Sequence, residues 1–496
     1  MTFSKWNHSK SGELAKSLKY LVFVIIAVGI LLRLAVFLQC NSMYIDEANI
    51  ARNIYERTFS GLIHPLSYDQ FAPPVFLWVV KLCTTLFGYS EYSYRLYPFV
   101  CGILSLWILL LVLRYYTDNT GIWYVLLLFA FGPIYVRYTQ ATKQYSPDIF
   151  ITLILLWLAL KNTFESTPAI RLFLLWSIVG SIAIWSSMPS AFILAGIGCY
   201  YLVGALQKRD YFKVWFLLVV GIIWLIQFAG YYIIILKPQT GLQGLVNYHK
   251  EFFFYPPISL NVLLKDINLV LYFISTAGGY LGLPLVFHII CITIGIAYLG
   301  RRDIAKLVLL IVPVFAVFFA AALHQYSLIQ RVSLFAMPLL LILIAVGLQQ
   351  ILHWRFPIIR LAAIVIAIIC VVDFNALRNF VRPLQTEEIK LSLDFLKKRD
   401  IKGTGLCMHN FASPAYIYYT QIHPQKEKWT SLLGASTFVG GVNIEELVKS
   451  LPKRFAIMYS WEEAPKIEAQ QLAFRRNVIL VDSNIVMGGK VYIYQK

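Results

Sequence analysis

Long, almost uncharged hydrophobic blocks separated by short polar turns dominate the first three quarters of the chain. Residues 20–37 contain a single charged side chain, Arg33, and residues 339–348 contain none. A block of roughly 17–25 apolar residues is long enough for a helix to cross the hydrocarbon core of a bilayer. Strands of a membrane β-barrel would instead alternate apolar and polar residues. The pattern therefore predicts a polytopic membrane protein built as an all-α bundle.

The blocks predict about eleven membrane spans. They cover residues 20–38, 93–113, 121–138, 147–161, 171–188, 189–206, 212–236, 281–299, 303–323, 332–350 and 357–375. Residues 73–88 are also apolar, but they begin with two prolines and contain Lys81. We interpret them as a helix that lies along, or dips into, the outer membrane interface.

Basic residues are concentrated in every second turn of this topology. If the polar N-terminus, residues 1–19, is cytoplasmic, the cytoplasmic turns contain Arg114, Lys161, Arg171, Lys208, Arg209, Lys213, Arg301, Arg302, Lys306 and Arg355. Short loops rich in Lys and Arg remain on the cytoplasmic side of a membrane. The opposite, outer face is then predicted to carry residues 39–92, 139–146, 237–280, 324–331 and 377–496.

Composition agrees with this topology. The 496-residue chain is 59% hydrophobic and 14% charged, with a mean hydropathy of +0.68, whereas soluble domains carry about 25% charged residues. These values argue against a soluble enzyme, a disordered chain and a disulfide-rich secreted domain. The net charge of +18 is not gathered into basic patches on a soluble fold, so we expect no nucleic-acid partner. The seven cysteines form no CxxC pair, which argues against a zinc ribbon.

The composition changes after the last predicted span. Residues 386–400 have the pattern of an amphipathic helix ended by Gly403, and Ser413 is predicted to be the N-cap of a second helix with Pro414 at its first position. Residues 455–459, 478–481 and 490–494 have the pattern of strands. The sequence thus predicts three parts. They are a cytoplasmic N-terminus (1–19), a transmembrane domain (20–376) with its first outer loop at 39–92, and an extracytoplasmic α/β domain (377–496).

Two adjacent carboxylates, Asp46 and Glu47, follow the first span directly. Placing a carboxylate at the membrane border costs free energy unless the group is ion-paired, hydrated or needed for function. A structural alternative is an ion pair with Arg52 or Arg57. Adjacent residues point in different directions on a helix or a strand, so the two are not the facing pair of a glycosidase. We expect one of them to face a cavity and the scaffold to hold the other.

Other polar residues gather in the same outer segments. Asp69 and Gln70 lie in the first outer loop, and Lys143, Arg331 and Arg95 flank other outer turns. Cations at these places can simply extend toward lipid headgroups. Three cations beside a carboxylate also suit a bound phosphate, and this favours a functional site.

Several of these segments resemble a known family. These segments contain the motifs Asp46-Glu47-Ala48, the run from Asn53 to Phe59, Tyr68-Asp69-Gln70-x-Ala72-Pro73, Phe87-Gly88-x-Ser90-Glu91-Tyr92-x-x-Arg95-Leu96-x-Pro98, Lys143-Gln144-Tyr145-Ser146-x-Asp148 and Arg331-x-x-Leu334-Phe335-x-x-Pro338. In this order they resemble bacterial, protein-mannosyltransferase-like membrane enzymes of the GT-C glycosyltransferase superfamily (family 39 type, RgtA/B/C/D-like). The resemblance covers roughly residues 20–375. One departure is that Asp69-Gln70 stands where many relatives have a His-Pro-Pro-Leu motif.

The resemblance implies a GT-C-type bundle that transfers a hexose or pentose from a polyprenyl-phosphate donor. Transfer would occur with inversion, to an acceptor hydroxyl at the outer face of the bacterial cytoplasmic membrane. The acceptor would be a glycolipid such as a lipopolysaccharide precursor, a polysaccharide or a protein. Asp46 would be the base, with Glu47 as the second catalytic candidate. The predicted substrate-binding residues are Arg95, Lys143, Tyr145, Arg331, Asp69 and Gln70.

Two alternatives remain open at the level of sequence. Asp46 and Glu47 could hold a divalent metal ion, although no ligand spacing requires one and no other cofactor is implied. The chain could instead be a transporter or flippase of lipid-linked sugars. Transporters place ionisable residues at mid-membrane, whereas the few in these spans, such as Arg33 and Arg137, lie toward span ends. That distribution favours the enzyme.

Overall fold

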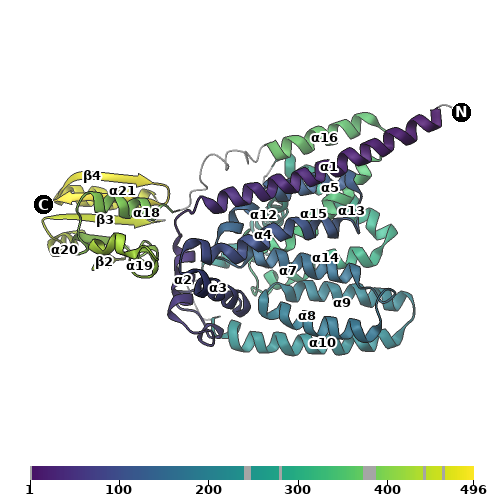
Figure 1. The fold of residues 1–496 in the computed structure, drawn as a ribbon, viewed down its shortest axis with the longest axis horizontal. Coiled ribbons are helices and arrows are strands. Elements are labelled where there is room, and N and C mark those ends of the chain that lie inside the picture. Colours follow the sequence, from purple (N-terminus) through teal and green to yellow (C-terminus); the bar gives the residue numbers. More distant parts are fainter. Residues whose placement is uncertain (1–2, 240–246, 279–281, 373–386, 440–442, 461–463) are drawn as a thin grey trace.

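The apolar blocks form helices that lie side by side in an elongated bundle, and an α/β domain lies beyond one end of that bundle (Figure 1). The computed structural model describes residues 3–239, 247–278, 282–372, 387–439, 443–460 and 464–496. The helices of the bundle are α1 (Phe3–Leu38), α4 (Glu91–Leu113), α5 (Asn119–Phe131), α6 (Pro133–Arg137), α7 (Tyr145–Lys161), α8 (Ala169–Ser186), α9 (Ser190–Gln207), α10 (Tyr211–Tyr231), α12 (Leu260–Gly278), α13 (Leu283–Arg302), α14 (Ile304–Ala322), α15 (Met337–Leu352) and α16 (Pro357–Val372).

Within the described ranges, nine helices are long and apolar enough to cross a membrane, and the bent pair α5–α6 makes ten. The predicted all-α membrane fold is thereby confirmed. The fourth and eleventh predicted spans correspond to α7 and α16, which have only 17 and 16 residues. The prediction that 237–280 is only an outer loop missed α12, whose apolar pattern is interrupted by Lys265 and Asp266.

A break between α5 and α6 redirects the chain toward the outer-loop segments. The two helices are bent by 51° at Gly132-Pro133, where proline cannot donate to the preceding turn. The carbonyl groups of Phe129 and Ala130 instead accept hydrogen bonds from the guanidinium of Arg33, at 2.9 and 2.8 Å. Arg33 is fully buried. Its guanidinium group supplies these carbonyls with hydrogen bonds that lipid could not provide.

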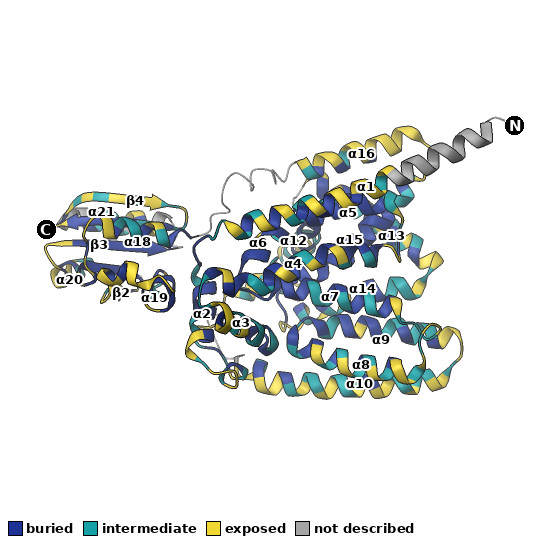
Figure 2. Cartoon of the chain, in the orientation of Figure 1, coloured by how far each residue is buried: buried dark blue, intermediate teal, exposed yellow. Residues whose placement is uncertain are grey.

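Close helix packing fixes the segment between α6 and α7. A Cβ atom at Gly102 of α4 would lie 2.2 Å from the side chain of Thr139, so only glycine allows this approach. Ser146, in the first turn of α7, donates a 3.0 Å hydrogen bond to the carbonyl of Pro98 and holds the end of this segment to α4. At the centre of the bundle, nearly every side chain of α15 is buried (Figure 2).

Several of the predicted cytoplasmic turns contact one another at one end of the bundle. Tyr116 donates to the carbonyl of Lys306 at 3.4 Å, and Asp118 lies 3.8 Å from His353. The N-terminal end of α1 points away from the α/β domain (Figure 1). The turns that contain Arg114, Lys306 and Arg355 therefore share one end of the molecule.

Two shorter helices lie between the first span and α4, beside the end of the bundle that faces the α/β domain (Figure 1). They are α2 (Ile45–Glu56) and α3 (Pro74–Phe87). Fourteen residues of α3 would rise only about 21 Å, less than the hydrocarbon core of about 30 Å. Gly88 ends α3 with φ +82, a conformation that glycine adopts without strain.

The C-terminal domain is a mixed sheet with helices on both faces. Its elements are α18 (Ile389–Lys398), β1 (Leu406–His409), α19 (Ser413–Ile417), β2 (Ser436–Phe438), α20 (Ile444–Ser450), β3 (Arg454–Ser460), α21 (Ala464–Asn477), β4 (Ile479–Val486) and β5 (Gly489–Gln495). The strand order is β2-β1-β3-β5-β4, with β1 parallel to β2 and β3 and with β5 antiparallel to β3 and β4. Alternate residues of β3 pack on opposite faces, Phe455 toward α21 and Ala456 toward α18.

The predicted α/β class of this domain is confirmed, and the three predicted strands coincide with β3, β4 and β5 apart from their ends. The sequence did not reveal β1 and β2. Ser413 is the first residue of α19 and not its cap, which is Ala412. The predicted domain boundary at 376–377 and the start of the predicted helix at 386 lie outside the described residues.

Candidate active site

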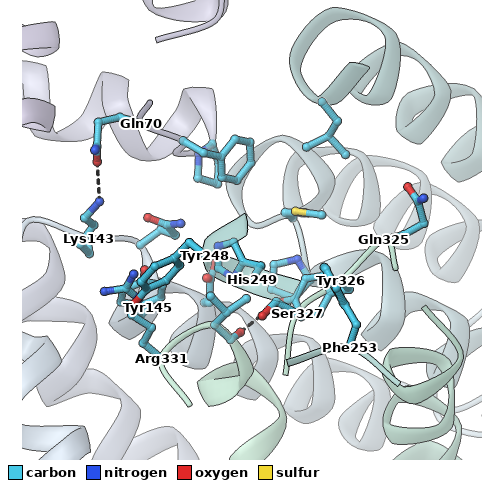
Figure 3. A pocket seen from close by; sticks show the side chains of 18 of the residues that line it. Gln70, Lys143, Tyr145, Tyr248, His249, Phe253, Gln325, Tyr326, Ser327 and Arg331 are labelled. Carbon is cyan, nitrogen blue, oxygen red and sulfur yellow. Dashed lines mark hydrogen bonds between the residues drawn. The ribbon is translucent and has the colours of Figure 1, made fainter. Parts of the chain in front are cut away.

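A cavity of about 430 Å³ lies among the loop segments next to α2. Five segments that are distant in the sequence supply most of its wall (Figure 3). They contribute Asp46; Asp69, Gln70, Phe71 and Pro73; Lys143, Gln144, Tyr145 and Asp148; Tyr248, His249, Lys250, Phe253 and Tyr255; and His324, Gln325, Tyr326, Ser327, Arg331 and Val332. The cavity thus collects all the predicted site residues except Glu47 and Arg95.

Asp46 lies in the first turn of α2 and faces two cations. Its Oδ2 atom is 3.8 Å from Nζ of Lys143 and 3.5 Å from a terminal nitrogen of Arg331. Burial alone would raise the pKa of Asp46, but Lys143 and Arg331 hold it below its ordinary value. The carboxylate is therefore ionised at neutral pH.

The two cations keep donors that Asp46 does not use. Both contacts to Asp46 are longer than the 2.7–2.9 Å of a tight charged hydrogen bond. Lys143 is buried and donates to the amide oxygen of Gln70 at 2.7 Å (Figure 3). Nε of Arg331 is buried and makes no hydrogen bond to any described residue. An oxyanion such as a phosphate can therefore accept hydrogen bonds from both cations, and no tight ion pair has to break first.

Glu47, the neighbour of Asp46, points away from the cavity into the scaffold. Arg95 of α4 binds it through two hydrogen bonds, from Nε to Oε1 at 2.9 Å and from a terminal nitrogen to Oε2 at 2.6 Å. The backbone N–H of Thr142 donates to Oε1 at 2.6 Å. Both side chains are almost fully buried, with 1% and 4% exposure. Neither has a free oxygen or guanidinium edge facing the cavity.

The turn before α3 is held in an unusual backbone conformation. Tyr68 and Asp69 have φ values of +66 and +51, which cost energy for residues other than glycine. The hydroxyl group of Tyr68 receives a 2.6 Å hydrogen bond from Arg52, and it donates to Glu56. These contacts fix the turn and place Asp69 and Gln70 in the cavity wall.

One wall of the cavity was not identified from the sequence. Residues 248–255 lie in the long segment before α12, and the ring of Tyr248 packs against Arg331. The guanidinium lies 5.3 Å from the ring centre of Tyr248, within cation–π range. Burial, with a contribution from Arg331, lowers the pKa of His249 to about 4, so its imidazole is neutral at pH 7. The density of Tyr and Phe in this segment was the only sequence signal.

Asp46 and Glu47, the two residues that could hold a metal ion, do not face the same cavity. Among the residues that the structure describes, no group of three or more His, Cys, Asp or Glu side chains could hold one. Glu47 is engaged by Arg95, so it cannot act with Asp46 as a ligand pair.

A family model described as dolichyl-phosphate-mannose-protein mannosyltransferase matches residues 72–234. A search of curated proteins finds no match. The fold matches ArnT from Cupriavidus metallidurans, solved in the apo state, with a TM-score of 0.53 and 12% identity over 95% of this chain and 97% of ArnT. ArnT bound to undecaprenyl phosphate matches with the same TM-score and coverage at 13% identity.

The apo oligosaccharyltransferase from Archaeoglobus fulgidus also matches, with a TM-score of 0.51 and 13% identity over 89% of this chain and 70% of that protein. At these identities the structural likeness establishes the fold. Together with the family match, it confirms the resemblance to GT-C glycosyltransferases that the ordered motifs indicated.

Proposed function

We propose that this chain is a membrane glycosyltransferase that moves a sugar from a polyprenyl-phosphate donor to an acceptor hydroxyl. The observation that carries the proposal is the cavity in which Asp46 meets Lys143 and Arg331. One carboxylate and two cations are the groups that such a transfer needs. Among solved proteins of the same fold, ArnT has been crystallised with undecaprenyl phosphate, and the archaeal enzyme AglB has been solved with a dolichol-phosphate.

In the proposed reaction, the acceptor oxygen forms a bond to the anomeric carbon of the sugar as the bond from that carbon to the phosphate oxygen breaks. Asp46 takes the proton of the acceptor hydroxyl. The electron pair of the broken bond leaves on the polyprenyl phosphate, whose growing charge is stabilised by Lys143 and Arg331. Attack opposite the leaving group inverts the anomeric centre.

The donor also changes the basicity of Asp46. Without a ligand, Lys143 and Arg331 stabilise the Asp46 carboxylate and make it a weak base. A bound phosphate shares these cations, and its own negative charge disfavours a second anion nearby. The pKa of Asp46 should therefore rise when the donor binds, so that the base becomes stronger only in the loaded enzyme.

Arg331 should contribute mainly to donor binding. Arg331→Ala is expected to lower kcat/KM for the donor roughly 10- to 100-fold, since hydrogen bonds to a charged group contribute about 1.5–3 kcal/mol. Arg331→Lys should restore part of this loss, because it returns the charge without the two-pronged geometry. Initial rates against donor concentration, for purified variants in nanodiscs, measure both effects.

The matched control for this series is Arg355→Ala, which removes an exposed arginine from the turn between α15 and α16. It should leave donor dependence unchanged. If Arg331→Ala lowers thermal stability but not donor dependence, Arg331 is structural and the phosphate site lies elsewhere.

The positive-inside pattern gives the site an orientation, which we propose as outward in a bacterial cytoplasmic membrane. In a cysteine-free background, an impermeant thiol reagent added to intact spheroplasts should label Glu446→Cys in the α/β domain. It should not label Arg302→Cys until the membrane is opened. Both residues are exposed, so protection reports the membrane side and not burial. The reverse labelling would contradict the orientation.

A further inference from the structure

We infer that Glu387 of the α/β domain is a positioning residue for Asp46, because it completes the N-terminus of the helix that carries Asp46. The inference rests on the proposed function, in which Asp46 is the base. The α/β domain, which supplies no reacting group in the proposed sugar transfer, would then hold the catalytic base in position.

Helix α2 lacks a capping side chain of its own. The first N–H groups of a helix have no partner within it, and Ser, Thr, Asp or Asn usually supplies one from the position before the helix. Here Tyr44 occupies that position and makes no side-chain capping bond. The N–H of Ile45, the first residue of α2, instead donates to Oε2 of Glu387 at 3.2 Å. The acceptor comes from 342 residues further along the chain.

Glu387 is itself held in place. It is 1% exposed, and Ser460 at the end of β3 donates to the same Oε2 atom at 2.8 Å. Burial raises the pKa of Glu387 to about 8, with smaller contributions from Asp46 and Glu47. The carboxyl group is therefore mostly neutral at pH 7. A neutral acid keeps the carbonyl oxygen that both donors need.

The segment leading into α2 is fixed by the same domain. The N–H of Met43 donates to the hydroxyl of Tyr419 at 2.8 Å, and Ser42 bonds to Oε2 of Glu388 at 3.2 Å. The ammonium group of Lys390 donates to the carbonyl of Cys40 at 2.6 Å. From the other side, Arg95 donates to the carbonyl groups of Asn41 and Ser42, at 2.8 and 3.2 Å. Residues 40–45 are thus held between the domain and the bundle.

A second contact anchors the domain to the start of α4. Glu91 is buried, and its two oxygens receive hydrogen bonds from Tyr419 at 3.0 Å and His423 at 2.9 Å. Lys390 lies 3.0 Å from the same carboxylate. The domain is therefore docked on elements beside the cavity by buried polar contacts, and Figure 1 shows it next to α2.

Asp46 directly follows the capped residue Ile45. A turn of helix that loses its cap frays, and its side chains then sample other directions. An error of about 1 Å in a reacting group can lower a rate 100-fold. Loss of the Glu387 contact should therefore act on turnover through Asp46, while the phosphate-binding cations Lys143 and Arg331, which come from other segments, stay in place.

The test uses the full-length protein in nanodiscs with an undecaprenyl-phosphate-linked sugar as donor. Glu387→Ala should lower kcat roughly 10- to 100-fold and leave the donor KM near its wild-type value. Glu387→Gln keeps the acceptor oxygen and should retain most of the wild-type kcat. The matched control, Glu446→Ala, removes an exposed glutamate of the same domain and should change neither constant.

Hydrogen exchange gives a readout that does not depend on activity. Amides of residues 44–48 should exchange faster in Glu387→Ala than in the wild type, and Glu387→Gln should protect them. If the wild type transfers no sugar, the proposed function fails, and this exchange result alone decides whether Glu387 holds α2. Wild-type kcat and exchange in Glu387→Ala, or an equal loss in Glu387→Gln, would overturn the inference.

Discussion

Replacing Asp46 by asparagine should reduce sugar transfer by at least about 100-fold while the protein remains folded. Asparagine preserves the shape of the side chain but cannot take the proton of the acceptor. It also cannot hold the negative charge that pairs with Lys143 and Arg331. Donor binding should therefore persist or strengthen, since the phosphate no longer competes with a carboxylate for the two cations.

The measurement is kcat and the donor KM for purified Asp46→Asn, with Asp118→Asn as a control at the opposite end of the bundle. The pH dependence supplies a second check. Because the two cations lower the pKa of Asp46, kcat/KM should fall only below the ordinary range of aspartate. Lys143→Met removes one of these cations and should move this acid limb to higher pH. Near-normal turnover by Asp46→Asn would exclude Asp46 as the base.

Replacing Arg95 by alanine should lower the free energy of unfolding by about 3–5 kcal/mol. The change leaves the Glu47 carboxyl group buried and without its two guanidinium hydrogen bonds. It also frees the carbonyl groups of Asn41 and Ser42. Thermal unfolding in detergent measures the loss. Arg399→Ala, which breaks an exposed ion pair with Asp482, should cost less than about 1 kcal/mol.

A double variant separates a structural role of Arg95 from a direct role in phosphate binding. Arg95→Met combined with Glu47→Leu removes both charges and should recover much of the lost stability. If Arg95 bound the donor, Arg95→Ala would instead raise the donor KM with little change in thermal unfolding. That result would contradict the assignment of Arg95 to the scaffold.

The sequence was most informative where a single physical rule decides the outcome. Long apolar blocks must become helices in a bilayer, because lipid offers no hydrogen bonds to the backbone, and the resulting bundle is the one observed. The helix α12 was missed because Lys265 and Asp266 break its apolar run. Strands β1 and β2 have only four and three residues, too few for a periodic pattern to be recognised.

The candidate site could be predicted only in part. The topology placed Asp46, Lys143 and Arg331 on one face, and the structure brings all three to one cavity. The sequence could not show which of Asp46 and Glu47 faces the cavity. This depends on how α2 is rotated about its own axis where it packs beside α4. Nor could it show that Arg95 is bound to Glu47, because local patterns do not encode contacts between residues 48 positions apart. The wall at 248–255 lies in a long loop without periodicity, so its approach to Arg331 depends on tertiary packing.

The central claim is that this cavity transfers a sugar from a polyprenyl phosphate. It is tested most directly by mass spectrometry of cell-envelope glycans and polyprenyl-phosphate sugars in cells that lack the gene and carry either the wild-type chain or Asp46→Asn. The account predicts that one envelope glycan loses a single sugar in the deletion strain, and that its lipid-linked donor accumulates. The wild-type chain should reverse both changes, and Asp46→Asn should reverse neither although it is present in the membrane. Full restoration of the glycan by Asp46→Asn, or an unchanged glycan profile in the deletion strain, would contradict the account.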